Sequence, residues 1–360
     1  MGLKNKMAAR IVFVDDVFCG EDSDEGQNPI NPVIEEEKDD ESEEQSGSED
    51  ENEENNWVFG ACEPTRLDFT ADEGLNANLP DSPSFSEYFH LLFPDYPFED
   101  MARHANKYVR ETVVSLRERE LLSPNSRFST WPEDGVTPND IKAFLAMIVA
   151  MGLVNRECIQ DYWSTDEVLS TPFLSQILSK DKFLKILTFF HLCDNDRYVP
   201  RGQEGFNPER KLGTVYSVVT EKFSSVWKPG KNTYIDEGMI PFRGKVYFKV
   251  YSPDKPDKYG VKSYQLCDSG NGFCCRFEIY TSVSTDSPNG KGKTYGLVMR
   301  LIQPYLNVGR CLFVDNFYIS PILFTALYQV NTGACGTARL RKGIPNAFRN
   351  VQVKKVRNLS

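Results

Sequence analysis

The chain has 360 residues, room for roughly two or three domains, and a formal net charge of −11. It has no run of about 18 apolar residues, which excludes a membrane span, and Asp15-Asp16 interrupt the short apolar stretch near the N-terminus, which argues against a secretory signal peptide. Its nine cysteines show no CxxC pair and no zinc-type Cys/His spacing, so we expect a reduced intracellular protein with neither disulfides nor zinc.

The acidic charge is concentrated near the N-terminus. Residues 21–55 hold 17 Asp and Glu residues and one Lys, a net charge of −16, whereas residues 56–360 carry a net +4. Because residues 21–56 have few apolar side chains to bury, we expect a disordered acidic N-terminal region over residues 1–84, with Phe69 as one docking point. The acidic segment is either a solubilising spacer or a mimic of DNA that occupies a basic groove.

Helical patterns fill residues 85–228. The clearest helix starts at Thr137-Pro138-Asn139-Asp140, where Thr suits the N-cap, Pro suits the first helical position and Asp140 completes a capping-box-like pattern. Further helices are expected from about residue 84 and over 101–122, 182–193 and 214–227. The buried stripe of the helix after Thr137 is predicted to be Ile141, Phe144, Leu145, Ile148 and Val149.

Strand patterns dominate the next segment. Three strands are expected over residues 233–268, because β-branched and aromatic residues recur there between links rich in turn formers. A tight turn at 269–272 leads to a strand over 274–281, then a helix over 294–306 and a short strand over 310–314. A helix over 321–330 with Ser320 as N-cap and a strand over about 335–340 complete a mixed α/β domain, residues 229–345.

Two carboxylates occupy informative places in this domain. Asp236 lies on the first strand among apolar neighbours, where it is either a water-facing residue near a strand end or a metal ligand. Asp315 follows the short strand at 310–314 directly, and the carboxyl ends of strands are where open α/β sheets build sites. Two such oxygen ligands suit Mg²⁺, which binds through one or two carboxylates together with substrate phosphates.

Four sequence words resemble the catalytic region of piggyBac-type DNA transposases: IDEGMIPFRGK, SPDKPDKYGVKSYQLCDS, VDNFYIS and GTARLRKGIP. The upstream words QDYWSTDEVLSTPF, LSKDKFLKILTFFHLCDND and VVTEKFSSVWKPGKN look like the same family's preceding helical region, so the resemblance covers about residues 85–345. It implies a ribonuclease-H-like core at 229–345, a helical DNA-binding region at 85–228 and metal-dependent cut-and-paste chemistry. It also implies that Asp236 and Asp315 are catalytic and bind Mg²⁺.

The resemblance also implies a third Asp, on a helix well downstream of the second. Residues 316–360 contain neither Asp nor Glu, and Glu237 or Asp268 could replace the third acid only through a local rearrangement. The family's Cys-rich C-terminal zinc domain has no counterpart in these residues either. We therefore expect an incomplete core, weak Mg²⁺ binding and a basic tail over residues 346–360.

Three classes of function follow: a transposase-derived DNA-binding protein that is not transposition-competent alone, an active transposase whose third acid is supplied elsewhere, and a protein-interaction scaffold. Basic side chains favour the first class over the third, although lysines on a sheet edge are also routine protection against aggregation. DNA is the expected partner, the nucleus the expected location, and a homodimer is compatible with a sequence that does not specify the oligomeric state. The expected DNA-binding residues are Arg243, Lys245, Lys255, Lys258, Lys262, Arg339, Arg341 and Lys342.

Overall fold

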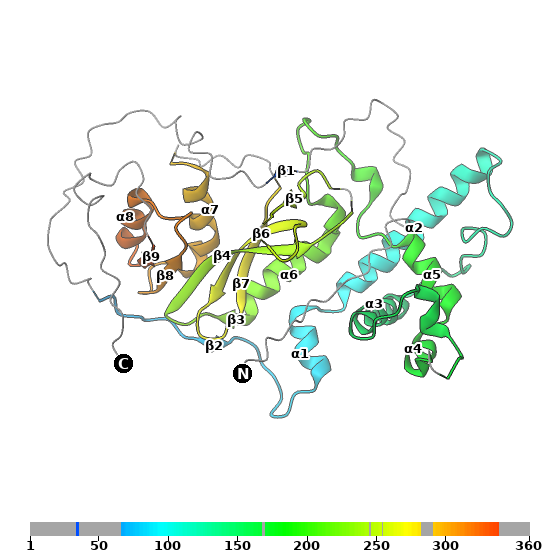
Figure 1. The fold of residues 1–360 in the computed structure, drawn as a ribbon, viewed down its shortest axis with the longest axis horizontal. Coiled ribbons are helices and arrows are strands. Elements are labelled where there is room, and N and C mark those ends of the chain that lie inside the picture. The colour runs from blue at the N-terminus through cyan, green and yellow to red at the C-terminus, as the bar shows by residue number, and fades with distance from the viewer. Residues whose placement is uncertain are drawn as a thin grey trace. The chain divides into compact units, whose positions relative to one another are not determined.

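The computed structural model describes residues 66–167, 170–244, 246–253, 255–281 and 291–337, together with the backbone of Ile34–Glu35 (Figure 1). Apart from Ile34–Glu35, the acidic segment at 21–55 lies outside the described residues, and so does the predicted basic tail at 346–360. The predicted DNA-binding residues Lys245, Arg339, Arg341 and Lys342 lie outside them as well. The chain divides into two compact units: among the described residues, the first holds Leu79–Lys222 and the short segment from Arg243, and the second holds the residues before Leu79, Phe223–Phe242 and the residues from Tyr247 onward. No helix in the described ranges combines the length and apolar character that crossing a bilayer requires.

The first unit is helical. Its helices are α1 (Phe85–Leu92), α2 (Tyr96–Glu118), α3 (Pro138–Leu153), α4 (Pro172–Ile177), α5 (Lys180–Phe189) and the first part of α6 (Gly213–Val226). Two capping boxes begin α1 and α3: Ser84 pairs with Glu87, and Thr137 pairs with Asp140 as its spacing predicts. The N-terminus of α5 is tied to the second box, because Lys182 Nζ lies 2.6 Å from Asp140 Oδ1.

The core of this unit lies between α2, α3 and α5. Ile141, Phe144 and Met147 are the buried residues of α3, and they pack with Phe183 and Ile186 of α5. The predicted stripe is therefore right at its first two positions and wrong at Val149, which is 68% exposed. Leu145 and Ile148 of the predicted stripe are partly buried against this core, and the stripe omitted the buried Met147.

The second unit is built on a mixed sheet with the strand order β1-β5-β6-β4-β8-β9, and β7 pairs with β6 beside β5. The strands are β1 (Ile34–Glu35), β4 (Asn232–Pro241), β5 (Val250–Tyr251), β6 (Tyr259–Asp268), β7 (Cys274–Ile279), β8 (Cys311–Val314) and β9 (Gly333–Gly336). β4, β6 and β7 form an antiparallel meander, whereas β4, β8 and β9 run parallel. The mixed α/β class predicted from the sequence is therefore confirmed, but the second predicted strand shortens to β5 because residues 247–248 form a turn.

Two helices pack on this sheet, α7 (Lys293–Ile302) and α8 (Pro321–Gln329), and Figure 1 shows them beside β8 and β9. Leu301 and Leu323 are fully buried with Ile235, Leu266 and Leu312 of the strands. Burying one such side chain contributes roughly 1.5–3 kcal/mol. A shift of one residue would turn these side chains away from the core, so the cluster fixes the register of β4, β6 and β8.

Residues 66–78 form an ordered strap on the second unit, whereas the sequence predicts a linker there. The backbone N–H of Thr70 donates to the carbonyl of Val308, and β2 (Gly74–Leu75) pairs with β3 (Trp227–Lys228). Phe69 lies beneath the guanidinium of Arg310, 5.2 Å from ring centroid to Cζ, and so is a docking point as expected. The strap therefore connects the start of β4 to the start of β8.

Candidate metal centre

Strand pairing brings Asp236 and Asp315 together. In the parallel pair of β4 with β8, Ile235 lies opposite Val314; Asp236 is the next residue of β4, and Asp315 directly follows β8. Adjacent strands lie about 4.8 Å apart, and alternation places both acids opposite the buried face of Ile235 and Val314. Both carboxylates are exposed, Asp236 in the middle of β4 and Asp315 directly after the last residue of β8.

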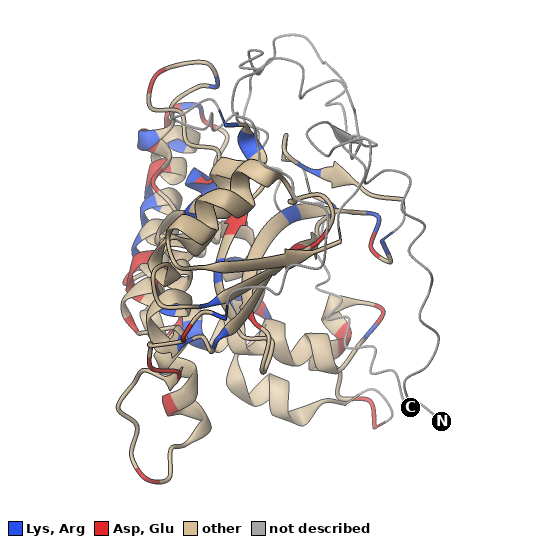
Figure 2. Ribbon diagram, turned by 90° about the vertical axis from the view of Figure 1, so that its left-hand side faces the viewer, with Lys and Arg blue, Asp and Glu red and all other residues tan. Residues whose placement is uncertain are grey.

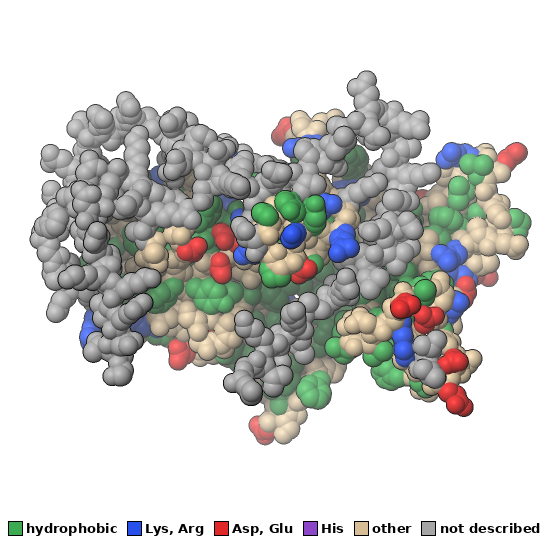
Figure 3. Space-filling view, viewed as in Figure 1, with side chains coloured by type: hydrophobic (Ala, Val, Ile, Leu, Met, Phe, Trp, Pro, Cys, Tyr) green, Lys and Arg blue, Asp and Glu red, His purple; other side chains and the backbone are tan. Residues whose placement is uncertain are grey.

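The local backbone orients each carboxylate. Asp236 Oδ1 accepts a hydrogen bond from the N–H of Glu237 at 2.8 Å, and Asp315 Oδ1 accepts one from the N–H of Asn316 at 2.6 Å. Neither carboxylate forms an ion pair with any basic side chain that the structure describes. In the space-filling view, acidic side chains gather over the part of the sheet where β4 and β8 lie (Figure 3). Two adjacent carboxylates without a basic partner favour a bound cation.

Glu237 is committed to a structural contact. Alternation points it to the buried side of the sheet, where Tyr318 Oη donates a hydrogen bond to Glu237 Oε1 at 2.5 Å. Tyr318 is almost fully buried, and burial together with the charge of Glu237 raises the pKa of its hydroxyl. Because Tyr318 closes the turn after Asp315, this bond ties the Asp315 turn to the Asp236 strand.

Asp268 is committed elsewhere as well. It lies opposite Thr233, toward the other end of β4, and accepts hydrogen bonds from the indole N–H of Trp227 and the N–H groups of Gly230 and Gly270. Burial raises the pKa of Asp268, but these three donors outweigh it, so the net pKa lies below its ordinary value. Neither Glu237 nor Asp268 is placed to act as a third ligand.

The donor set at the sheet edge fits a hard cation only in part. Across the described ranges, no group of three or more His, Cys, Asp or Glu side chains is arranged to hold a metal ion. Two carboxylate donors match the part that proteins usually supply to Mg²⁺, with water and substrate phosphate completing the shell.

The basic residues predicted to bind DNA fall into different places. Lys262 on β6 lies beside the turn after Asp315, because its Nζ is 5.8 Å from the ring centroid of Phe317, but its pairing with Met239 places it on the face of Glu237, opposite to Asp236. Lys255 and Lys258 are exposed in the loop between β5 and β6, at the end of the sheet where β4 finishes. Arg243 is also exposed but belongs to the first unit.

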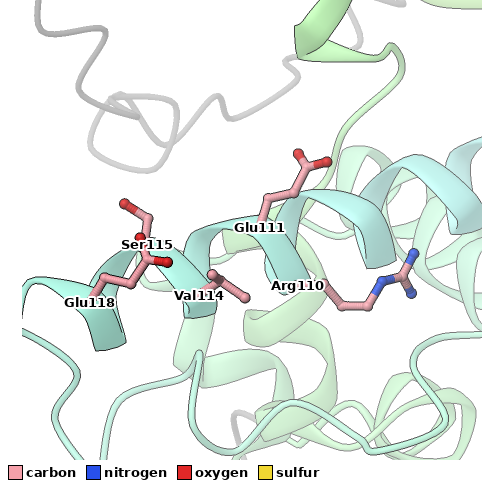
Figure 4. A pocket seen from close by; sticks show the side chains of 5 residues that line it. All are labelled: Arg110, Glu111, Val114, Ser115 and Glu118. Atoms are coloured by element: carbon pink, nitrogen blue, oxygen red, sulfur yellow. The ribbon is translucent and has the colours of Figure 1, made fainter.

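Sequence reasoning missed the roles of Tyr318 and Phe317. The available signal was their place in VDNFYIS, immediately after the second acid. A hollow on α2 was not predicted either, and it is lined by Arg110, Glu111, Val114, Ser115 and Glu118 (Figure 4). All five side chains come from one helix and their charges are mixed, so they do not form a set of polar groups directed at one ligand.

The strand order and the acid pair define the class of protein, a ribonuclease-H-like transposase fold. A protein-family model described as Transposase IS4 matches residues 84–359, so the chain belongs to this family, in its piggyBac type. PiggyBac transposable element-derived protein 3 from Homo sapiens is 26% identical over 263 residues, covering 71% of this chain and 40% of that protein. PiggyBac transposable element-derived protein 5 from Homo sapiens is 22% identical over 289 residues, covering 78% of this chain and 51% of that protein.

A solved structure shows the same fold. It is a piggyBac transposase in a synaptic complex with hairpin DNA, which matches 74% of this chain and 53% of its own with a TM-score of 0.61 and 24% identity. The chain thus spans about half or less of the length of the curated relatives described above.

Proposed function

We propose that this chain is a transposase-derived DNA-binding protein in which Asp236 and Asp315 hold a divalent cation, Mg²⁺ in the cell. The observation that supports it most strongly is the pairing of Ile235 with Val314, because the two acids are the residues that follow this pair on adjacent strands. The relative solved with hairpin DNA supports a nucleic-acid substrate. Nuclear location is part of the proposal, and a homodimer is compatible with it.

We propose that DNA contacts the sheet beside the turn after Asp315 and the loop between β5 and β6. Lys262 lies beside Phe317 and over the ring of Tyr264, at 5.5 Å from its centroid, so one cation and two aromatic rings meet beside the turn that follows Asp315. Such a combination suits phosphate and unstacked bases. The exposed Lys255 and Lys258 extend the positive charge. The proposal assigns the remaining phosphate contacts to Arg243, Lys245, Arg339, Arg341 and Lys342. In contrast, acidic and basic residues are interleaved along the helices in Figure 2.

The two carboxylates set a limit on the chemistry. A bound cation supplies charge stabilisation to a phosphate oxygen, and a two-ion clamp stabilises both the attacking and the leaving oxygen. Asp236 and Asp315 position the ion, while Tyr318 and Glu237 fix the turn that carries Asp315. Because residues 316–360 add no carboxylate, we propose weak metal binding and no excision by this polypeptide alone.

The test combines DNA binding and excision with residues 1–360 as the sole protein. We expect fluorescence anisotropy to show binding to duplex DNA that weakens steeply with salt, because phosphate contacts release counterions. We expect a donor plasmid carrying family-type ends to stay intact in the presence of Mg²⁺. Clean excision that Asp315→Asn abolishes would show an active transposase, and salt-independent or absent DNA binding would favour an interaction scaffold.

A further inference from the structure

Two cysteines face each other across the hairpin formed by β6 and β7. Cys267 lies opposite Cys274 in the antiparallel register, directly after a register shift at Leu266. Both thiols are free, and they lie close enough for each to shift the pKa of the other. Opposed residues in antiparallel strands have Cα atoms about 4.5–5.5 Å apart, within the range that a disulfide spans. The strand register therefore places the two residues at a backbone separation that a disulfide can span.

The two thiols are chemically different from each other. The neighbouring Cys274 thiol lowers the pKa of Cys267 to about 7, burial opposes this, and the nearby hydroxyl of Tyr234 supports it. The neighbouring Cys267 in turn raises the pKa of Cys274, so Cys274 keeps its proton, and its Sγ donates to the carbonyl of Arg276 at 3.5 Å. Cys267 is thus the thiolate and nucleophile of the pair, and Cys274 is placed to resolve it.

Cys275 provides a natural internal contrast. It is next to Cys274 in sequence but fully buried, and burial raises its pKa to about 12. Neighbouring strand residues point to opposite faces, and Cys275 packs in the core with Ile235 and Leu266. Cys275 therefore shares the sequence environment of the pair without its geometry.

We propose that Cys267 and Cys274 form a reversible disulfide when the protein meets a hydroperoxide. The Cys267 thiolate attacks a peroxide oxygen, an S–O bond forms as the O–O bond breaks, and the leaving hydroxide takes up a proton to become water. The Cys274 sulfur then attacks the sulfenic sulfur, the S–S bond forms as the S–O bond breaks, and the Cys274 proton leaves with the hydroxide as a second water. Two thiols are oxidised to one disulfide and one peroxide is reduced to two waters. The reduced state expected from the sequence is the resting form.

The disulfide would act on the strand that carries Asp236. Cys267 lies opposite Tyr234 on β4, two residues before Asp236 and on the same face of the sheet. The bond converts the Cys267 thiolate, which lies opposite Tyr234, into a neutral sulfur and fixes β6 to β7 at the bulge. The site is thus a redox modification that reaches the neighbourhood of the metal centre without using its ligands.

Peptide mapping of the folded full chain tests this directly. Trypsin releases residues 263–276 as one peptide that contains all three thiols. The protein is treated with hydrogen peroxide, quenched, denatured and alkylated with N-ethylmaleimide, which labels each free thiol. We expect this peptide to lose two of its three labels together, and fragmentation to place the remaining label on Cys275. Dithiothreitol added before alkylation should restore all three labels. The Cys275→Ser variant should behave like wild type, and Cys274→Ser should leave Cys267 as a sulfenic acid that dimedone labels.

Three results would overturn the proposal. One is a peptide that keeps all its labels at a peroxide dose that already oxidises the exposed Cys158. Another is a retained label on Cys267, which would show a bond between Cys274 and Cys275. The last is the same loss of label in guanidinium-unfolded protein, which would show that the fold does not direct the reaction. Because no step involves metal or DNA, the result is independent of the proposed function.

Discussion

A hydrogen bond between Tyr318 and Glu237 holds the turn after Asp315 against the strand that carries Asp236. Each is next to or near a carboxylate of the candidate site, yet both point to the buried side and bond to one another. The bond joins two segments that are far apart in sequence, so it constrains the Asp315 turn more than a local contact could. Its contribution to stability is therefore measurable separately from metal binding.

We predict that Tyr318→Phe lowers the free energy of unfolding by about 1–2 kcal/mol, because a hydrogen bond to a charged acceptor is lost from a mostly buried site. Urea denaturation measures this. Tyr328→Phe is the matched control, since Tyr328 is 58% exposed, and it should change stability by less than about 0.5 kcal/mol. Equal values for the two variants would mean that the Tyr318 bond is not formed.

Asp268 illustrates a carboxylate whose role is purely structural. Its folded-state pKa lies below its ordinary value, so it contributes stability at pH values above the unfolded pKa of about 4, and that contribution is lost as pH falls through the folded pKa. We predict that the unfolding free energy of Asp268→Asn depends less on pH below about 4 than that of wild type. Urea denaturation at a series of pH values measures it, with Glu204→Gln in an exposed loop as the control. Parallel pH curves for Asp268→Asn and wild type would contradict the assignment.

The element that the sequence describes least well is the strap at residues 66–78. It has neither helical nor strand periodicity, and many of its contacts are backbone hydrogen bonds, which no side-chain pattern reports. The regular elements were easier, because Thr137 and Ser320 cap their helices as their spacing predicts. Val149 was misassigned because α3 is apolar on several sides, so periodicity does not decide which side faces the core.

Gly309 holds the strap to β8 and gives a test of it. It has φ +76°, and a Cβ there would lie 2.0 Å from the carbonyl oxygen of Asp68. Gly272 has the same φ but open space around a Cβ, so it isolates the backbone strain, about 1 kcal/mol. We predict that Gly309→Ala costs more than Gly272→Ala and speeds hydrogen exchange at Thr70, whose N–H bonds to Val308. Equal costs with unchanged exchange at Thr70 would show that the strap is not docked there.

At the scale of the whole molecule, the mixed sheet and the two acids followed from the sequence once the family resemblance was included. Strand order could not follow from periodicity, because the parallel pairing of β4 with β8 joins residues about eighty positions apart. The hydrogen bonds of Glu237 and Asp268 could not be predicted from the sequence either, because each partner is distant along the chain. In the folded chain, Asp236 and Asp315 are therefore exposed side by side, whereas Glu237 and Asp268 are hydrogen-bonded to other residues.

The most direct test of the central claim is a calorimetric titration of Mn²⁺, as a probe for Mg²⁺, into residues 1–360. The account predicts weak binding to wild type that falls at least about tenfold in Asp236→Asn and in Asp315→Asn. The double variant should lose little more than either single variant, because both acids hold one ion. Glu204→Gln, an exposed acid in the first unit, should bind like wild type. The same affinity in wild type and in both single variants would contradict a metal centre at Asp236 and Asp315.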